Sequence, residues 1–284
     1  MTKTATCQLC KRDFLTVDMV KLSLARRGDR SAFLCDECKD VLYGYHSMSA
    51  TNYRVVGKPN VNRMTYGLEL ETMRPDLTAR IELFADGFIP TRDCTVDAEF
   101  VSPIYNGLQA PMKHFVTIER LMRENHLDIN TNGNANGSGC GTHFHVGNAD
   151  YINAETISWL KRFYHTLFVP LSEEMQAHPA ETTALFGRNF TYYAREITRG
   201  SYADAHENWV NLQHSKTVEF RLPVFRNAEQ YAEVARFCDE VAKCLINNFI
   251  KHFNDKGDDR NYRLHKAQVT ANKLVKIYKK YAGV

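Results

Sequence analysis

Four short segments of this chain alternate apolar and charged residues with a period of two. The segments are residues 66–73, 94–104, 142–147 and 217–223. A period of two predicts β-strands with one apolar and one polar face, because successive side chains of a strand point to opposite sides. The pattern is typical of an antiparallel sheet whose apolar face is covered by helices.

Apolar residues recur at helical spacing in four other segments. These segments are residues 112–125, 154–175, 228–253 and 262–281. Strands and helices mixed in this order predict an α+β fold with helices flanking the sheet. The chain has 284 residues, and 44% of them are hydrophobic, so it is long enough to bury a packed core.

Membrane segments and leader sequences are not expected. No apolar run approaches the roughly 20 residues that span a bilayer. The first residues lack the apolar stretch and the cleavage site of a secretory signal. We therefore expect a cytoplasmic protein that does not contact a membrane.

The C-terminal segment 260–282 is basic and contains no acidic residue. It predicts a helix docked through an apolar seam that includes Leu264, Leu274 and Tyr278, with its lysines in solvent. The alternative is an arm that binds the phosphates of a nucleic acid. The net charge of +3 is too small to favour nucleic acid.

Two Cys-x-x-Cys pairs lie within residues 1–46: Cys7 with Cys10, and Cys35 with Cys38. Four thiolates form a closed tetrahedral site for structural zinc. A module of fewer than 50 residues buries only a small core, so a bound metal ion is a plausible source of its stability. We expect a small zinc-ribbon or zinc-knuckle module, since a redox Cys-x-x-Cys normally begins a helix in a βαβ unit. Its balanced charge leaves a protein or a nucleic-acid partner open.

The sequence divides into three parts. Residues 1–46 form the zinc module, residues 47–63 are a polar linker, and residues 64–284 form the larger domain, which ends in the basic helix.

The charged faces of the four strands carry acids, histidines and one arginine, but no lysine. These residues are Glu69, Glu71, Asp93, Asp97, Glu99, His143, His145, Glu219 and Arg221. A solvated sheet face also alternates, but it usually includes Lys, Ser and Thr. Carboxylates crowded on one face repel each other unless cations neutralise them. Oxygen-rich sites favour Mg²⁺ or Mn²⁺, and a histidine can join such a site.

Four motifs in this order resemble the amidoligase family. They are Gly67-Leu-Glu-Leu-Glu, Glu99-Phe-Val-Ser-Pro after Asp93, Cys140-Gly-Thr-His-Phe-His-Val, and Thr217-Val-Glu-Phe-Arg after Asn211-Leu. The family belongs to the carboxylate–amine ligase superfamily, which includes glutamine synthetase and glutamate–cysteine ligase. The resemblance covers about residues 64–250. It implies a curved antiparallel sheet of the glutamine synthetase type, whose concave face binds ATP and two or three divalent ions.

The resemblance also assigns roles by position. The implied ligands of Mg²⁺ or Mn²⁺ are Glu69, Glu71, Glu99, His143 and Glu219. His145 and Asn211 would line the nucleotide or substrate pocket. Which of His143 and His145 ligates metal is left open.

Four residues would take part in the chemistry. Arg221 would hold the γ-phosphate of ATP. Arg188 is a second candidate for that role, or else a structural ion-pair partner. Asp93 and Asp97 would bind the incoming amine or accept its proton.

The expected activity is ATP- and magnesium-dependent ligation of a carboxylate to an amine through an acyl phosphate. One alternative is a metal-dependent hydrolase, because His-x-His beside carboxylates also suits water activation. Another is a non-enzymatic zinc-containing adaptor that binds protein or nucleic acid. An adaptor is expected to have lost some of the motif acids, and all of them are present. The identity of the carboxylate and the amine, and the oligomeric state, are left open.

Overall fold

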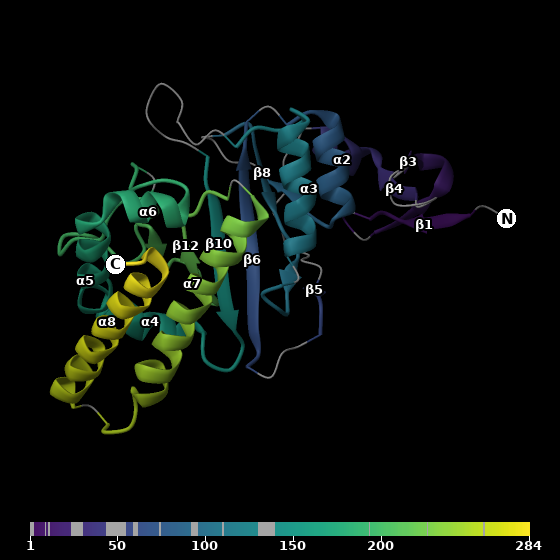
Figure 1. The fold of residues 1–284 in the computed structure, drawn as a ribbon. Coiled ribbons are helices and arrows are strands. Elements are labelled where there is room, and N and C mark those ends of the chain that lie inside the picture. Colours follow the sequence, from purple (N-terminus) through teal and green to yellow (C-terminus); the bar gives the residue numbers. More distant parts are fainter. Residues whose placement is uncertain are drawn as a thin grey trace.

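The computed structural model describes residues 3–8, 10, 12–23, 31–43, 55–58, 62–73, 75–91, 96–109, 111–129, 140–192, 194–225, 227–257 and 259–284. It shows an α+β fold with one large sheet and helices packed around it (Figure 1). The sheet contains β5 (Val55–Val56), β6 (Met64–Thr72), β7 (Ile89–Thr91), β8 (Ala98–Val101), β9 (Ile104–Tyr105), β10 (Thr142–Asn148), β11 (Val210–Asn211) and β12 (Thr217–Phe220).

The strands follow the order β11-β12-β10-β6-β8-β7, with β9 beside β6 and β5 beside β9. All the pairs are antiparallel except β5 with β9. The mostly antiparallel sheet and the α+β class were both predicted from the sequence. The segment expected as a linker contributes the short strand β5.

The apolar face of the sheet forms the core. In register, Leu68 of β6 lies opposite Phe144 of β10, and Phe144 lies opposite Phe220 of β12. All three side chains are buried in one hydrophobic cluster. The period-two pattern thus separates an apolar from a charged face, as predicted.

Helices cover that apolar face. The helices of the larger domain are α2 (Leu77–Ala85), α3 (Met112–Arg123), α4 (Ala154–Arg162), α5 (Tyr164–Ala177), α6 (Pro179–Phe186), α7 (Ala228–Asn248) and α8 (Arg260–Ala282). In Figure 1, α3 and α7 lie in front of the sheet, and α7 contacts both α3 and β10. α8 packs on α5 and α7, on the side away from β7.

One predicted strand and one predicted helix are each divided in two. The segment 94–104 yields β8 and β9, which are separated by Ser102 and Pro103. Pro103 has no N–H to donate to a neighbouring strand, and at the same break the Leu68 N–H donates to the side-chain hydroxyl of Ser102 at 2.8 Å. The segment 154–175 breaks at Phe163 into α4 and α5.

The basic helix α8 is docked, as the apolar seam predicts. Leu274 and Tyr278 are buried, whereas Leu264, expected on the same seam, is 38% exposed. Two of its lysines form ion pairs with acids of neighbouring helices. Lys280 lies 2.7 Å from Glu240 of α7, and Lys279 lies 3.0 Å from Glu174 of α5. No helix in the described parts of the chain is long and apolar enough to cross a membrane.

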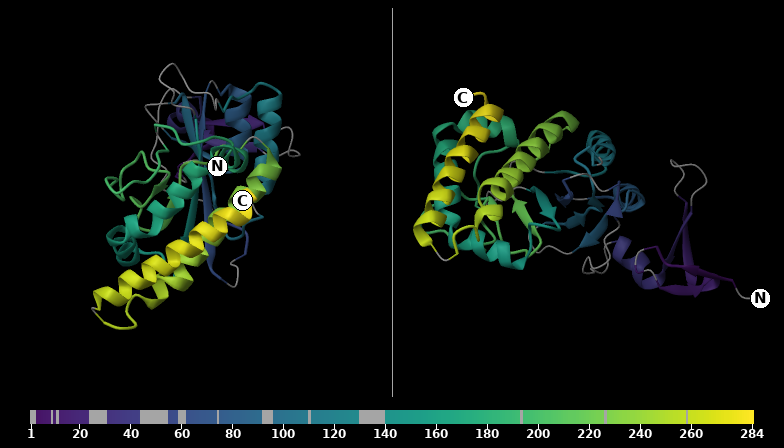
Figure 2. Two further views of the ribbon diagram at one scale, coloured as in Figure 1. Left: turned by 60° about the vertical axis from the view of Figure 1, so that its left-hand side comes forward. Right: turned by 90° about the horizontal axis from the view of Figure 1, so that it is seen from below.

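The N-terminal module stands at the opposite end of the molecule from α8 (Figure 2). It contains β1 (Thr4–Thr6), β2 (Asp13–Leu15), η1 (Thr16–Asp18), β3 (Met19–Ser23), β4 (Ser31–Cys35) and α1 (Asp36–Tyr43). β1 pairs with β2, and β3 pairs with β4. Val41 and Leu42 of α1 share a small hydrophobic cluster with Phe84 of α2 and Ile89 of β7. The module therefore packs on the edge of the main sheet.

Candidate functional site

Strand register brings the predicted charged residues together on one face of the sheet. Glu71 of β6 lies opposite Glu99 of β8, and Glu69 lies opposite His143 of β10. On the other side of β10, His145 lies opposite Glu219 of β12. Directly opposed residues of antiparallel strands share a face. Together with Arg221, which follows β12, these six residues form what is called the charged face below.

His143 is at the centre of the charged face. Its Nδ1 lies 3.2 Å from Glu69 Oε2 and 3.3 Å from Glu219 Oε1. Its Nε2 lies 3.3 Å from Glu71 Oε1. The neighbouring His145 places Nε2 3.3 Å from Glu69 Oε1. Both ring nitrogens of His143 therefore face carboxylates.

The charged face is buried rather than solvated. The side chains of Glu219 and His143 are 1% and 3% exposed, and that of Glu69 is 20% exposed. Ionised carboxylates are buried at high cost unless cations or hydrogen-bond donors surround them. An ordinary solvated sheet surface is therefore excluded for these residues.

The charges on this face shift one another's pKa values. Burial raises the pKa of Glu71, but the charge and hydrogen bond of His143 outweigh it and lower the pKa to about 2. Burial and the nearby charge of Glu69 raise the pKa of Glu99 to about 7. Burial lowers the pKa of His143, yet the surrounding carboxylates raise it to about 9. Glu99 is thus the acid least compensated by cations.

Two arginines are buried here: Arg221, which belongs to the charged face, and Arg188, which lies beside it. Arg221 lies 2.7 Å from Glu219 Oε1. Arg188 donates to the backbone carbonyls of Leu222, Cys140 and Arg221 at 3.0, 3.3 and 2.7 Å. These bonds tie the start of β10 to the segment after β12, so Arg188 contributes to the architecture of the site.

Space for a side chain is tight just before β10, at Gly141. A side chain at Gly141 would approach an Arg188 guanidinium nitrogen to 3.0 Å and the His143 ring to 3.1 Å. The Gly141 N–H also donates to Glu71. The backbone therefore approaches the site closely at this point.

The remaining predicted residues lie in different places. Glu99 accepts a 2.6 Å hydrogen bond from Thr91 of β7. Asn211 of β11 is buried opposite Glu219. Asp97 is exposed in a bend before β8, near Arg80. Asp93 lies outside the described residues.

At the charged face, two groups of described side chains place metal-ligating atoms close together. One group is Glu69, His143 and Glu219, and the other is Glu69, His145 and His214. Within each group the ligand atoms lie within 4.8 Å of one another. Glu219 Oε2 is buried and has no hydrogen-bond partner among the described residues. Buried polar atoms are normally paired, so a bound cation would suit this oxygen. These donors fit a divalent metal ion.

His214 was not predicted from the sequence. It lies between β11 and β12, outside the alternating runs. The available signal was indirect: β11 and β12 carry Asn211 and Glu219 on the charged face, so a histidine in the short connection between them is held near that face.

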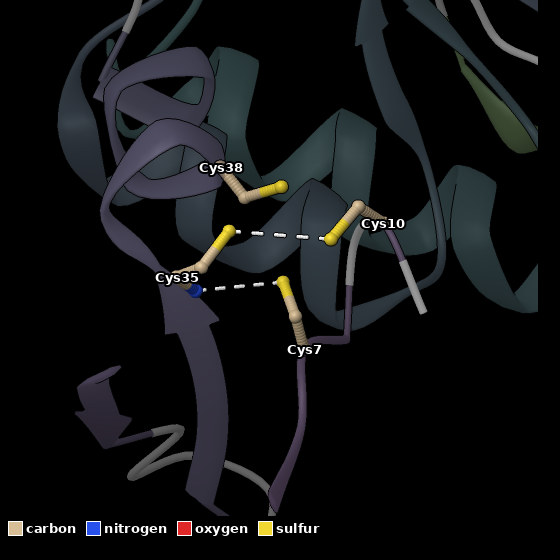
Figure 3. Close-up of side chains that lie close together, drawn as sticks. All are labelled: Cys7, Cys10, Cys35 and Cys38. Atoms are coloured by element: carbon tan, nitrogen blue, oxygen red, sulfur yellow. Dashed lines mark hydrogen bonds between the residues drawn. The ribbon is translucent and has the colours of Figure 1, made fainter. Parts of the chain in front are cut away.

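The four predicted cysteine ligands also converge. Cys7, Cys10, Cys35 and Cys38 lie with all four sulfur atoms within 4.8 Å of one another (Figure 3). The Cys10 and Cys35 sulfurs are 4.0 Å apart. Four sulfurs bound tetrahedrally at about 2.3 Å from one zinc ion would be about 3.8 Å apart. The cluster can therefore hold a structural metal ion such as zinc.

Local structure positions these cysteines. Cys7 follows β1, Cys35 ends β4 and Cys38 lies in the first turn of α1. The Cys35 N–H donates to Cys7 Sγ at 3.5 Å. Burial raises the pKa of Cys10, but a hydrogen bond from Arg12 outweighs it and lowers the pKa to about 7. Arg12 thus favours the thiolate of Cys10, whereas burial raises the pKa of Cys35 and of Cys38.

Comparison with known proteins gives no further assignment. No protein-family model matches the chain, and no curated protein matches it. The function proposed below therefore rests on the sequence motifs and on the geometry of the charged face.

Proposed function

We propose that this protein is an ATP- and divalent-metal-dependent ligase that joins a carboxylate to an amine. The observation that carries the proposal is the charged face itself, where acids, histidines and Arg221 from four antiparallel strands meet and are mostly buried. Such a face suits the binding of metal ions and the phosphates of a nucleotide. The mostly antiparallel sheet is compatible with the glutamine synthetase type that the sequence motifs suggest.

The proposed roles follow from position. Glu69, His143 and Glu219 would hold a divalent ion, and Glu99 would add a further carboxylate ligand. Arg221, which lies beside Glu219, would bind the γ-phosphate of ATP. Glu71 contacts the second ring nitrogen of His143 and would orient that ring, the role that carboxylates often have next to a metal-bound histidine.

ATP would supply the phosphoryl group that converts a carboxylate into an acyl phosphate, with release of ADP. The amine nitrogen would then attack the acyl carbon. A C–N bond forms, the C–O bond to phosphate breaks, and the nitrogen loses a proton. Asp97 or Asp93 would accept that proton. Metal ions and Arg221 would screen the negative charge of the phosphates.

A metal-dependent hydrolase is the second candidate function. It is favoured by the second group of ligand atoms, because two imidazoles, His145 and His214, meet one carboxylate there. Sites with several imidazoles are common in enzymes that activate water. A hydrolase would act without ATP and would form no ADP.

The substitution Glu99→Gln tests the ligase proposal. Burial and the charge of Glu69 already disfavour the ionised form of this carboxylate. The amide that replaces it can still accept a hydrogen bond from the Thr91 hydroxyl. We therefore expect a melting temperature equal to or above that of the unmodified protein, with carboxylate-dependent ADP release reduced about 100-fold. Glu173→Gln, an exposed change on α5, is the matched control.

The assay measures ADP and phosphate with panels of carboxylates, with and without amines. Hydroxylamine should trap the acyl phosphate as a hydroxamate. Substrate turnover without ATP would instead support the hydrolase. Full ADP release by the Glu99→Gln protein would remove Glu99 from the proposed site.

A further inference from the structure

We propose that Glu69, His145 and His214 form a second metal site next to the Glu69, His143 and Glu219 site, and that this second site selects a first-row transition metal ion over Mg²⁺. The inference rests on the proposed function only in taking the first group as a metal site. It adds a ligand, His214, that the sequence motifs do not supply, and a preference of this site for transition metal ions over Mg²⁺.

The two sites share carboxylates. Glu69 directs Oε2 to His143 Nδ1 at 3.2 Å and Oε1 to His145 Nε2 at 3.3 Å. Glu219 directs Oε1 to His143 Nδ1 at 3.3 Å and Oε2 to His214 Nε2 at 3.7 Å. Each carboxylate therefore faces one group with one oxygen and the second group with the other. Paired metal sites use bridging carboxylates in this way.

An independent observation points to a ligand at the second site. Glu219 is 1% exposed, and its Oε2 has no hydrogen-bond partner among the described residues. His145 Nε2 is also buried, and its contact among the described residues is Glu69 Oε1 at 3.3 Å, outside good hydrogen-bond geometry. Buried polar atoms are rarely left unsatisfied, because each costs about 1–3 kcal/mol. A cation held by Glu69, His145 and His214 would give His145 Nε2 a partner, and Glu219 Oε2 lies beside this group, 3.7 Å from His214 Nε2.

The ring of His145 is held in a suitable orientation. Its Nδ1 lies 3.3 Å from the hydroxyl of Thr217, on the neighbouring strand β12. A histidine that ligates metal through one nitrogen usually has a hydrogen-bond partner for the other. His145 has that arrangement, with Nε2 directed toward Glu69.

The ligand set decides the class of ion. Mg²⁺ prefers oxygen ligands and retains several waters, whereas imidazole nitrogen suits Mn²⁺, Zn²⁺ and other transition metals. Two imidazoles with one or two carboxylate oxygens therefore favour a transition metal. His214 is 50% exposed, so solvent or a substrate atom can reach an ion at this site.

The test uses the full chain, with zinc already bound to the four cysteines. Thiolates retain zinc against Mn²⁺, so added Mn²⁺ reports on the charged face. Titration is followed by the electron paramagnetic resonance signal of free Mn²⁺. We expect two bound Mn²⁺ ions per chain, of which a large excess of Mg²⁺ displaces at most one.

The substitution His214→Ala should weaken the affinity for the second Mn²⁺ by about 100-fold or more. Loss of a residue that only hydrogen-bonds a metal ligand already lowers metal affinity by about 10- to 100-fold. The first Mn²⁺ should stay bound. His265→Ala on α8, also an exposed histidine, is the matched control and should bind two. An unchanged melting temperature verifies that each variant is folded.

Two results would overturn the second site: one Mn²⁺ per chain in the unmodified protein, or equal Mn²⁺ binding by the unmodified and His214→Ala proteins. Either result leaves the ligase proposal standing, because that proposal depends on nucleotide binding. Failure of nucleotide binding with two Mn²⁺ ions still bound would instead overturn the ligase and keep the second site.

Discussion

A buried hydrogen bond between the sheet and α7 gives a quantitative test of the fold. The Tyr66 hydroxyl donates to Asp239 Oδ1 at 2.8 Å, and both residues are buried. Lys243 lies 2.6 Å from the other carboxylate oxygen. Tyr66→Phe removes the donor and leaves Asp239 Oδ1 buried without it. A hydrogen bond to a charged group contributes about 1.5–3 kcal/mol, so the free energy of unfolding should fall by about that amount.

A second tyrosine of the same core is the matched control. Tyr231 of α7 is fully buried, and its hydroxyl has no hydrogen-bond partner among the residues that the structure describes. Tyr231→Phe removes the same atom but no bond. We expect unchanged stability or a gain of up to about 1–2 kcal/mol, because an unsatisfied hydroxyl is costly to bury.

Urea unfolding of both variants, followed by circular dichroism, measures the difference. The two substitutions remove equal volume, so they should separate by about 1.5 kcal/mol or more if the hydrogen bond is responsible. Equal loss in both variants would show that the loss comes from packing, and would refute the assigned role of the Tyr66–Asp239 bond.

Three further outcomes are expected. Leu274→Ala should cost about 2–5 kcal/mol in urea unfolding because Leu274 is fully buried on the docked face of α8, whereas exposed Lys276→Ala should be nearly silent. Burial raises the pKa of Asp76, but its hydrogen bonds as the α2 N-cap outweigh this and lower it. Stability that depends on this carboxylate is therefore present above about pH 4 and is lost as the pH falls further, and Asp76→Asn should weaken that loss. Cys7→Ser with Cys10→Ser should abolish about one bound zinc per chain by elemental analysis.

Strand alternation predicted much of the charged face. Glu69, His143 and Glu219 lie in runs that alternate charged with mostly apolar residues, and the family resemblance then marked them as metal ligands. The strand register then determines which charged residues meet. An antiparallel pairing that buries Leu68 and Phe144 together also places Glu69 opposite His143. The apolar face therefore determines the geometry of the charged one.

Other features had no local signal. His214 lies in a short connection, and its approach to Glu219 depends on how β11 and β12 pair. The contact of the N-terminal module with Phe84 and Ile89 joins residues far apart in sequence, which no periodicity reveals. The three carbonyls that accept from Arg188 likewise come from two distant segments.

The central claim is that the charged face binds a nucleotide through metal ions. Calorimetric titration of ATP into the protein, with and without millimolar Mg²⁺ or Mn²⁺, tests it most directly. We expect ATP to bind only with the divalent ion present, and the Glu69→Gln protein to lose that binding while the Glu173→Gln protein keeps it. Absence of ATP binding at millimolar metal, or unchanged binding by the Glu69→Gln protein, would contradict the claim.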